Sequence, residues 1–219
     1  MKKVEVVTQI LSANDQIAEE NQILIQSRKI LAINLMASPG AGKTSLILQT
    51  AKVLNGRARL GVIEGDIASR IDADKVAAAG LPVVQINTGG TCHLDAPMIR
   101  QALSALPLGE IDILFVENVG NLICPVEFRL GEGLRVMIAS VAEGHDKPYK
   151  YPGIFTAVDA VVINKMDLAP YVEFDLAALR EAIGGLNRRA AIFEVSCRTG
   201  EGLAAWADWL ERQWRAQNG

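Results

Sequence analysis

From residue 30 onward, the chain alternates short apolar runs with segments whose apolar residues recur at helical spacing. Nearly every position of each run is apolar, which is typical of strands that are buried on both faces. The predicted strands are Ile30–Met36, Ala58–Glu64, Pro82–Ile86, Ile111–Glu117, Leu134–Val141, Ala157–Ile163 and Ala191–Val195. The predicted helices are Ser45–Leu54, Ile71–Ala79, Ala96–Leu106, Asp175–Ile183 and Leu203–Ala216. This alternation predicts an α/β fold with a mostly parallel central sheet and helices on both faces.

The amino-terminal segment at about 8–28 has a helical pattern of its own. The pattern is clearest over Ser12–Arg28, where Ser12 or Asn14 offers the side-chain oxygen that caps a helix start. At the other end of the chain, three tryptophans fall in the last predicted helix at spacings that favour core packing over a nucleic-acid platform. The sequence therefore predicts helices before the first strand and after the last.

Composition narrows the class of protein. The chain has 219 residues, of which 50% are hydrophobic, so we expect one domain over 1–219. Its 22 basic and 25 acidic residues form no stripe or tail that would indicate a nucleic-acid or membrane partner. The stretch after Met1–Lys3 is too short for a signal-peptide core, and three cysteines without framework spacing argue against a secreted disulfide scaffold. We expect a cytoplasmic protein.

A phosphate-binding loop lies between the first predicted strand and the first helix after it. The loop reads Ala37-Ser38-Pro39-Gly40-Ala41-Gly42-Lys43-Thr44, with Ser45 opening the helix. The backbone N–H groups of Gly40 through Ser45 are predicted to surround a nucleotide phosphate, helped by the positive end of the helix dipole. Lys43 is expected to reach the β- and γ-phosphates and to act in catalysis, and the Thr44 hydroxyl to hold Mg²⁺. Glycine-rich turns also connect strands to helices without a ligand, but the lysine and threonine favour nucleotide binding.

A second motif, Asn164-Lys165-Met166-Asp167, follows a later strand and predicts which base is bound. The Asp167 carboxylate can accept from guanine N1–H and the 2-amino group, whereas adenine has no amino group at that position. Two hydrogen bonds to a charged partner contribute about 3–6 kcal/mol, which is enough to select GTP over ATP. The loop at Ser196 and Cys197 comes after the next strand, where a backbone N–H is expected to contact guanine O6. We therefore predict a protein that binds GTP and GDP.

Two acids are expected at the same edge of the sheet. Asp66 and Glu117 each lie at the carboxyl end of a predicted strand, and ligands of open α/β sheets bind at that edge. Together with Thr44 they are the predicted Mg²⁺ ligands, and Asp66 is also a candidate to orient the attacking water. The alternative is that they are ordinary surface acids.

Three further side chains suggest a second metal. Cys92 and His93 lie in a glycine-rich loop after the third strand, and Cys124 precedes a proline in the loop after Glu117. Thiolate and imidazole ligands suit Ni²⁺ or Zn²⁺ and suit Mg²⁺ poorly. Three ligands leave a four-coordinate shell incomplete, so water or a second subunit has to supply the rest. The alternative is that the cysteines are small buried core residues.

These motifs, in this order and over essentially the whole chain, resemble the HypB family of hydrogenase nickel-incorporation GTPases. The resemblance implies a P-loop NTPase of the signal-recognition/MinD/BioD-like class that dimerises when GTP is bound. It implies nickel delivery to the [NiFe]-hydrogenase large subunit alongside a zinc-containing, HypA-like accessory protein, through Cys92, His93 and Cys124. The remaining alternatives are a urease-type nickel chaperone, which has a proline between its Cys and His, and a regulatory GTP-binding switch with structural cysteines.

The chain departs from parts of this family and class. It has neither the cysteine-rich nor the histidine-rich stretch with which some family members store nickel, so we expect only the internal metal site. Ser38 occupies the position at which some dimeric ATPases of the class carry a signature lysine. Lys147 and Lys150 are therefore candidates for nucleotide or interface contacts, although a solvated loop explains them equally well.

Overall fold

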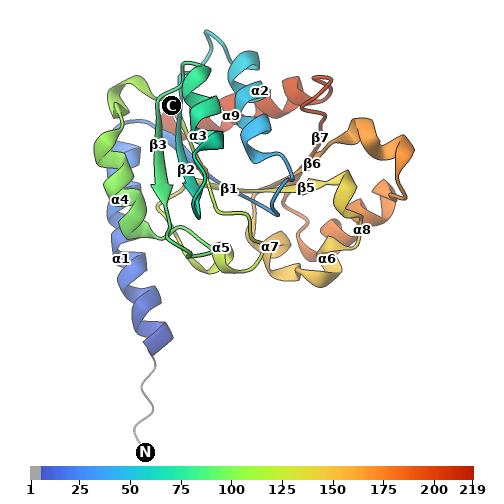
Figure 1. The fold of residues 1–219 in the computed structure, drawn as a ribbon, viewed down its shortest axis with the longest axis horizontal. Helices are drawn as coiled ribbons and strands as arrows, with labels where there is room; N and C mark the ends of the chain where they lie inside the picture. Colours follow the sequence, from blue (N-terminus) through green and yellow to red (C-terminus); the bar gives the residue numbers. More distant parts are fainter. Residues whose placement is uncertain (1–5) are drawn as a thin grey trace, which may run out of the picture.

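The fold is built on one parallel sheet of seven strands in the order β3-β2-β4-β1-β5-β6-β7. The computed structural model describes residues 6–219 (Figure 1). The strands are β1 Leu31–Ala37, β2 Leu60–Asp66, β3 Val83–Asn87, β4 Ile113–Glu117, β5 Leu134–Ser140, β6 Ala160–Asn164 and β7 Ala191–Glu194. All pairs of neighbouring strands are parallel, so the predicted α/β class is confirmed and the sheet is wholly rather than mostly parallel.

Helices cover both faces of the sheet. The helices are α1 Val6–Ser27, α2 Lys43–Val53, α3 Ile71–Ala78, α4 Ala96–Ala105, α5 Cys124–Glu127, α6 Lys147–Lys150, α7 Pro152–Ala157, α8 Leu176–Leu186 and α9 Leu203–Asn218. Buried side chains of α2, α3 and α9 pack on one face. On the other face, α1 and α4 pack beneath β1, β2 and β4, while α7 and α8 pack beneath β5 and β6. Two buried layers therefore enclose the sheet, as long apolar strands require.

The first helix differs from its predicted start. It runs through Ser12 and Asn14 from Val6, so neither residue is its cap. Asn14 is buried: its amide donates to the Arg129 carbonyl at 2.8 Å and accepts from the Ala96 N–H at 2.8 Å. The local preference of Asn14 for a helix cap predicts a boundary there, but its hydrogen-bond partners come from distant segments. The signal-peptide argument rests on residues 1–8, of which 1–5 lie outside the described part of the chain.

Three short helices, α5, α6 and α7, were not predicted. Each carries a proline in its first turn and spans four to six residues, too few for a hydrophobic period to be recognised. Both α5 and α6 follow the carboxyl ends of strands, on the side where β2 and β3 point in Figure 1. None of the helices between residues 6 and 219 has the length and apolar character needed to cross a bilayer.

The carboxyl ends of the strands gather the predicted motifs at one edge. The phosphate loop follows β1, and Asp66, Glu117 and Asn164 are the last residues of β2, β4 and β6. Strand β1 lies between β4 and β5, so the connections from β1 and β4 diverge there, at the kind of position where open α/β sheets bind ligands. Parallel register thus brings residues more than one hundred positions apart to one place.

Candidate functional site

The phosphate loop is held in a conformation that only glycine adopts easily. Gly40 and Gly42 have φ values of 76° and 104°. A Cβ at Gly42 would lie 2.4 Å from the Asn164 amide nitrogen, so a side chain there is excluded sterically as well. Helix α2 begins at Lys43, with Gly42 as its N-cap. The loop therefore ends with backbone N–H groups at a helix N-terminus, which is an anion-binding arrangement.

The Asn164–Asp167 motif is tied directly to this loop. The Asn164 amide donates to the Ala41 carbonyl at 2.9 Å, and Lys165 Nζ donates to the Gly40 carbonyl at 2.7 Å. Lys165 has a φ of 64°, one of two positive values among the described non-glycine residues. The Ser196 hydroxyl donates to Asp167 Oδ1 at 2.6 Å and orients the carboxylate. The predicted phosphate and base-reading segments therefore form one connected unit.

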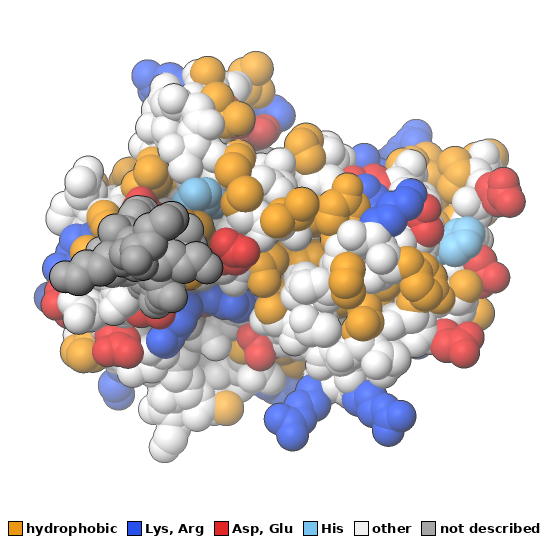
Figure 2. Space-filling view, turned by 90° about the horizontal axis from the view of Figure 1, so that it is seen from below, with side chains coloured by type: hydrophobic (Ala, Val, Ile, Leu, Met, Phe, Trp, Pro, Cys, Tyr) orange, Lys and Arg blue, Asp and Glu red, His pale blue; other side chains and the backbone are white. Residues whose placement is uncertain are grey.

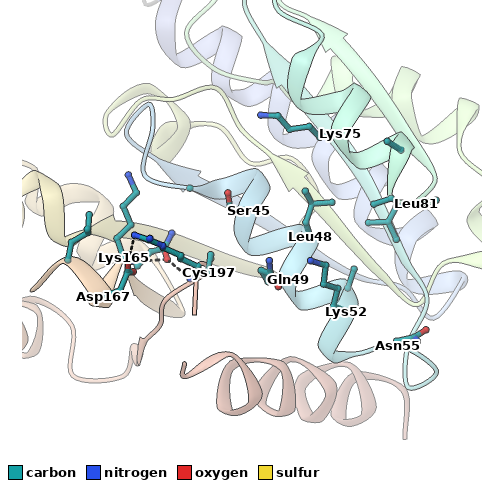
Figure 3. A pocket seen from close by; sticks show the side chains of 18 residues that line it. Ser45, Leu48, Gln49, Lys52, Asn55, Lys75, Leu81, Lys165, Asp167 and Cys197 are labelled. Carbon is teal, nitrogen blue, oxygen red and sulfur yellow. Dashed lines mark hydrogen bonds and ion pairs between the residues drawn. The ribbon is translucent and has the colours of Figure 1, made fainter. Parts of the chain in front are cut away.

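A cavity of about 1230 Å³ runs along this unit. Figure 3 shows Lys165, Asp167 and Cys197 at one end, and Lys52, Asn55 and Leu81 at the other. Burial raises the pKa of the Cys197 thiol to about 11, so this thiol stays protonated.

The loop predicted to contact guanine O6 already has acceptors inside the protein. The Ser196 N–H donates to the Glu201 carbonyl at 3.0 Å, and the Cys197 N–H donates to Asn164 Oδ1 at 3.3 Å. The contact with O6 therefore stays a prediction.

Two buried carboxyl groups lie under the phosphate loop. The Thr44 hydroxyl donates to Glu117 Oε1 at 2.9 Å. Glu64 pairs with Glu117 in the register of β2 and β4, and their side chains are 2% and 3% exposed. One oxygen of each, Oε2, has no hydrogen-bond partner within the described protein. Buried oxygens of this kind, beside a threonine hydroxyl, fit a hard divalent cation.

Burial governs the protonation of this pair. Desolvation, and after it the charge of Glu117, raises the pKa of Glu64 to about 8. Desolvation raises the pKa of Glu117 to about 7, against the opposing influence of Lys43 and of the Thr44 hydrogen bond. A cation bound here would favour the ionised forms. Glu64 was not singled out as a site residue, although every second residue of β2, from Leu60 to Asp66, shares its face.

Asp66 lies in a different environment from the buried pair. Its Oδ1 accepts from the backbone N–H groups of Ala68 at 2.9 Å and Ser69 at 2.7 Å. These backbone hydrogen bonds, that of Ala68 foremost, lower the pKa of Asp66. Asp66 is therefore held in place and ionised, which suits a residue that acts on Mg²⁺ or water.

The three predicted soft ligands come together. One ligand atom from each of Cys92, His93 and Cys124 lies within 4.8 Å of the other two. The Cys92 and Cys124 sulfurs are 3.0 Å apart, and Cys92 Sγ lies 3.9 Å from His93 Nδ1. All three side chains are partly exposed, so the interpretation as buried core cysteines does not fit.

Local contacts shift the pKa values of two residues of the cluster. The hydrogen bond between the Cys124 and Cys92 thiols, and after it burial, raises the pKa of Cys124, whereas a bound cation would favour its thiolate. Desolvation lowers the pKa of His93, which keeps the imidazole in the neutral form that ligates metals. The ring of His93 stacks on Phe128, with centroids 3.9 Å apart. Phe128 had no signal in the sequence, because the contact depends on how two loops meet.

The two candidate lysines are engaged elsewhere. Lys150 forms an ion pair with Asp146, and Lys147 Nζ lies 3.9 Å from Glu143 Oε1. Both belong to α6 rather than to an open loop. The Lys150 side chain is 61% exposed, which fits a solvated position, and the cationic groups of both lysines already have acidic partners, so a role in nucleotide or interface contacts stays a prediction.

A family model, related sequences and solved structures all indicate the same family. The family model for the CobW/HypB/UreG nucleotide-binding domain matches residues 31–194. The hydrogenase maturation factor HypB of Azotobacter vinelandii is 47% identical over 204 residues, which are 93% of this chain and 67% of that protein. The crystal structure of HypB from Helicobacter pylori in complex with nickel has a TM-score of 0.90 and 35% identity, covering 93% of this chain and 96% of that chain.

A more distant likeness concerns the fold alone. The signal recognition particle receptor FtsY from Elizabethkingia anophelis, solved in complex with GDP, has a TM-score of 0.54 and 15% identity. It covers 88% of this chain and 67% of that chain. Together with the HypB structure, this likeness confirms the predicted class of P-loop fold.

Proposed function

The chain belongs to the HypB family of GTPases, and we propose that it couples a GTP cycle to nickel delivery during maturation of a [NiFe]-hydrogenase. Residues 1–219 act as one GTPase unit in this proposal. The observation that carries it is the cluster of Cys92, His93 and Cys124 at the same sheet edge as the nucleotide motifs. A GTPase that does not bind a transition metal has no need for two thiols and an imidazole at this sheet edge.

The nucleotide end binds GTP and hydrolyses it. Backbone N–H groups of the phosphate loop, from Gly40 to Ser45, surround the phosphates, and Lys43 offsets the charge that develops as the γ-phosphoryl leaves. Thr44, Asp66 and Glu117 would hold Mg²⁺, which would supply positive charge against the phosphates. Asp66 orients the attacking water. Turnover is slow because the sequence shows no arginine finger.

The metal end carries nickel as cargo. A relative with 35% identity was solved in complex with nickel, and the donor set of this chain suits the same ion. Zn²⁺ is the alternative ion for these ligands. Three ligands require completion, which a second copy of the chain can supply across a two-fold axis.

Exposed apolar side chains support a homodimer at this edge. Ile123, the residue before Cys124, is 60% exposed, and Tyr149 in α6 is 72% exposed. Both α5 and α6 lie at the bottom of Figure 1 and face the viewer in Figure 2, where hydrophobic side chains gather across the middle. Patches of this kind mark surfaces that bind other proteins. The expected partners are a second copy, a HypA-like accessory protein and the hydrogenase large subunit.

Equilibrium titration with Ni²⁺ tests the function directly. Cys92→Ala, His93→Ala and Cys124→Ala are each expected to lower nickel affinity by more than about 100-fold, because even outer-shell changes cost 10–100-fold. GTP binding should stay near that of the parent. Cys197→Ala removes a thiol outside the cluster and should leave the nickel stoichiometry unchanged. Parent-like nickel binding by all three cluster variants would refute the metal function.

The pH dependence of the same titration gives a second check. Because thiols lose protons when they ligate, nickel affinity should fall as pH is lowered and protons should be released on binding. Each cluster cysteine that ligates nickel as a thiolate adds to this dependence of nickel affinity on pH. A nickel affinity that does not change with pH would contradict thiolate ligation.

A further inference from the structure

We propose that Asn118 is the positioning residue through which bound nucleotide and the Cys/His cluster influence each other. This inference rests on the proposed function, in which the GTP cycle and nickel binding are linked. Linkage requires that a change at one site alters the free energy of binding at the other. The segment from Glu117 to Cys124 spans both sites and supplies a physical route.

The first step uses the alternation of a strand. Glu117 ends β4 on the face where its carboxylate accepts from the Thr44 hydroxyl at 2.9 Å. Asn118 continues the ladder, because its N–H donates to the Leu35 carbonyl at 3.0 Å. Consecutive strand residues point to opposite faces, so Asn118 projects away from the nucleotide. A shift of Glu117 toward a bound cation therefore moves Asn118 on the far side.

The second step joins Asn118 to the loop that carries His93. Asn118 Oδ1 accepts from the backbone N–H of Leu94 at 3.1 Å and from that of Val119 at 2.9 Å. Its amide nitrogen donates to Asn34 Oδ1 at 3.1 Å. Both Asn118 and Leu94 are fully buried. The backbone of Leu94, one residue from His93, is therefore fixed by this side chain.

Close packing holds the residues between the two sites rigidly against one another. A Cβ at Gly65 would lie 2.7 Å from the Leu94 side chain, so Leu94 packs directly under the residue between Glu64 and Asp66. A Cβ at Gly120 would lie 2.9 Å from the ring of Pro39 in the phosphate loop. Densely packed groups transmit small displacements rather than absorbing them. Glu117 and Gly120, at the start and in the middle of the segment, thus both contact the nucleotide side.

The third step reaches the cysteines. The Asn121 amide donates to the Cys92 carbonyl at 3.4 Å, and Asn121 Oδ1 accepts from the Ile123 N–H at 2.9 Å, immediately before Cys124. Metal–ligand distances tolerate only about 0.2 Å of error. A displacement of a few tenths of an ångström along 117–124 therefore changes nickel affinity without any new contact to the ion.

The test compares nickel affinity in two nucleotide states. The dissociation constant for Ni²⁺ is measured with GDP and with a non-hydrolysable GTP analogue, both with Mg²⁺, and the ratio of the two constants is the coupling. We expect a ratio of about 5–150 for the parent, in the range usual for linked sites. Asn118→Ala should bring the ratio to within about two-fold of one while nickel and nucleotide still bind.

Asn187→Ala is the matched control. Asn187 also donates through its amide, to the carbonyls of Phe155 at 3.0 Å and Val158 at 2.8 Å, and accepts from two backbone N–H groups. It lies at the end of α8, outside the route, so its loss should leave the coupling ratio at the parent value. A ratio that falls equally in both variants would show a general loss of rigidity and would overturn the role of Asn118.

The remaining outcomes separate the two proposals. A parent-like ratio in Asn118→Ala refutes the role of Asn118 and leaves nickel delivery standing. A parent that binds both ligands with a ratio of one refutes the linkage itself, and this inference with it.

A measurement on the parent decides the matter if Asn118→Ala does not fold. Hydrogen exchange of the Leu94 amide, followed by NMR, should differ between the GDP and GTP-analogue states. Unchanged exchange would overturn the inference.

Discussion

The nucleotide end and the metal end of this protein lie at one sheet edge but are built in opposite ways. The nucleotide end is a closed set of internal contacts, in which Asn164 and Lys165 bond to the phosphate loop and Ser196 holds Asp167. The metal end consists of three partly exposed side chains on two loops, whose ligand atoms lie within 4.8 Å of one another but do not fill a coordination shell. One site is preorganised, whereas the other offers only three candidate ligands.

The difference follows from what each site has to do. A nucleotide that is exchanged many times is bound best by a rigid backbone cradle, because ordering costs are then small. A cargo ion has to be taken up and released, so an incomplete and exposed shell is suited to transfer. The segment from Glu117 to Cys124 connects the two and belongs to both.

The largest expected effect breaks base recognition alone. Asp167→Asn replaces an acceptor pair by one acceptor and one donor, which suits xanthine, whose 2-position is a carbonyl. Loss of the charged contacts should weaken GTP binding by about 3–6 kcal/mol, or roughly 10²–10⁴-fold, with a gain for the xanthosine nucleotide. Nucleotide titration measures both. Parent-like GTP affinity would refute the base-reading role, and nickel affinity serves as the unchanged control.

The next effect separates binding from turnover within the nucleotide end. Lys43→Ala removes a charge from the phosphates, so it should weaken nucleotide binding and slow hydrolysis together. Asp66→Asn keeps the acceptor for the Ala68 and Ser69 N–H groups and should mainly slow hydrolysis, by about 10²–10³-fold. Single-turnover rates and nucleotide titration on both variants distinguish these roles. An unimpaired Asp66→Asn would remove that carboxylate from the mechanism.

The smallest effect concerns the stability of the nucleotide end without its ligands. The folded-state pKa of Glu64 is raised to about 8, above its ordinary value, so its contribution to stability is present at low pH and is lost as pH rises toward 8. Glu64→Gln should therefore melt at least about 2–4 °C above the parent at pH 8, without nucleotide or divalent cation, and differ less at pH 5. Thermal melts of both proteins between pH 5 and pH 8 measure this difference. If the melting temperatures of Glu64→Gln and the parent differ equally at both pH values, the ionisation of buried Glu64 does not destabilise the parent at pH 8.

Contiguous motifs could be predicted because their geometry is local. The phosphate loop, the Asn164–Asp167 turn and the strand ends carry their conformational demands in adjacent residues, as the positive φ values of Gly40 and Gly42 illustrate. The strand periodicity likewise predicted the parallel sheet, because burial on both faces leaves a run of apolar residues. Asn14 was misread as a cap for the same reason, since only its local preference is visible in the sequence.

The sequence by itself determined the fold class, the GTPase family and the residues able to hold a soft metal. The tertiary structure alone decided that Glu64 pairs with Glu117, that Phe128 stacks on His93 and that Asn118 holds the backbone of Leu94. Each of these contacts depends on strand register or on the meeting of two loops, where partners are distant in the chain. A residue's own type records what it can bond to, but only packing selects the partner.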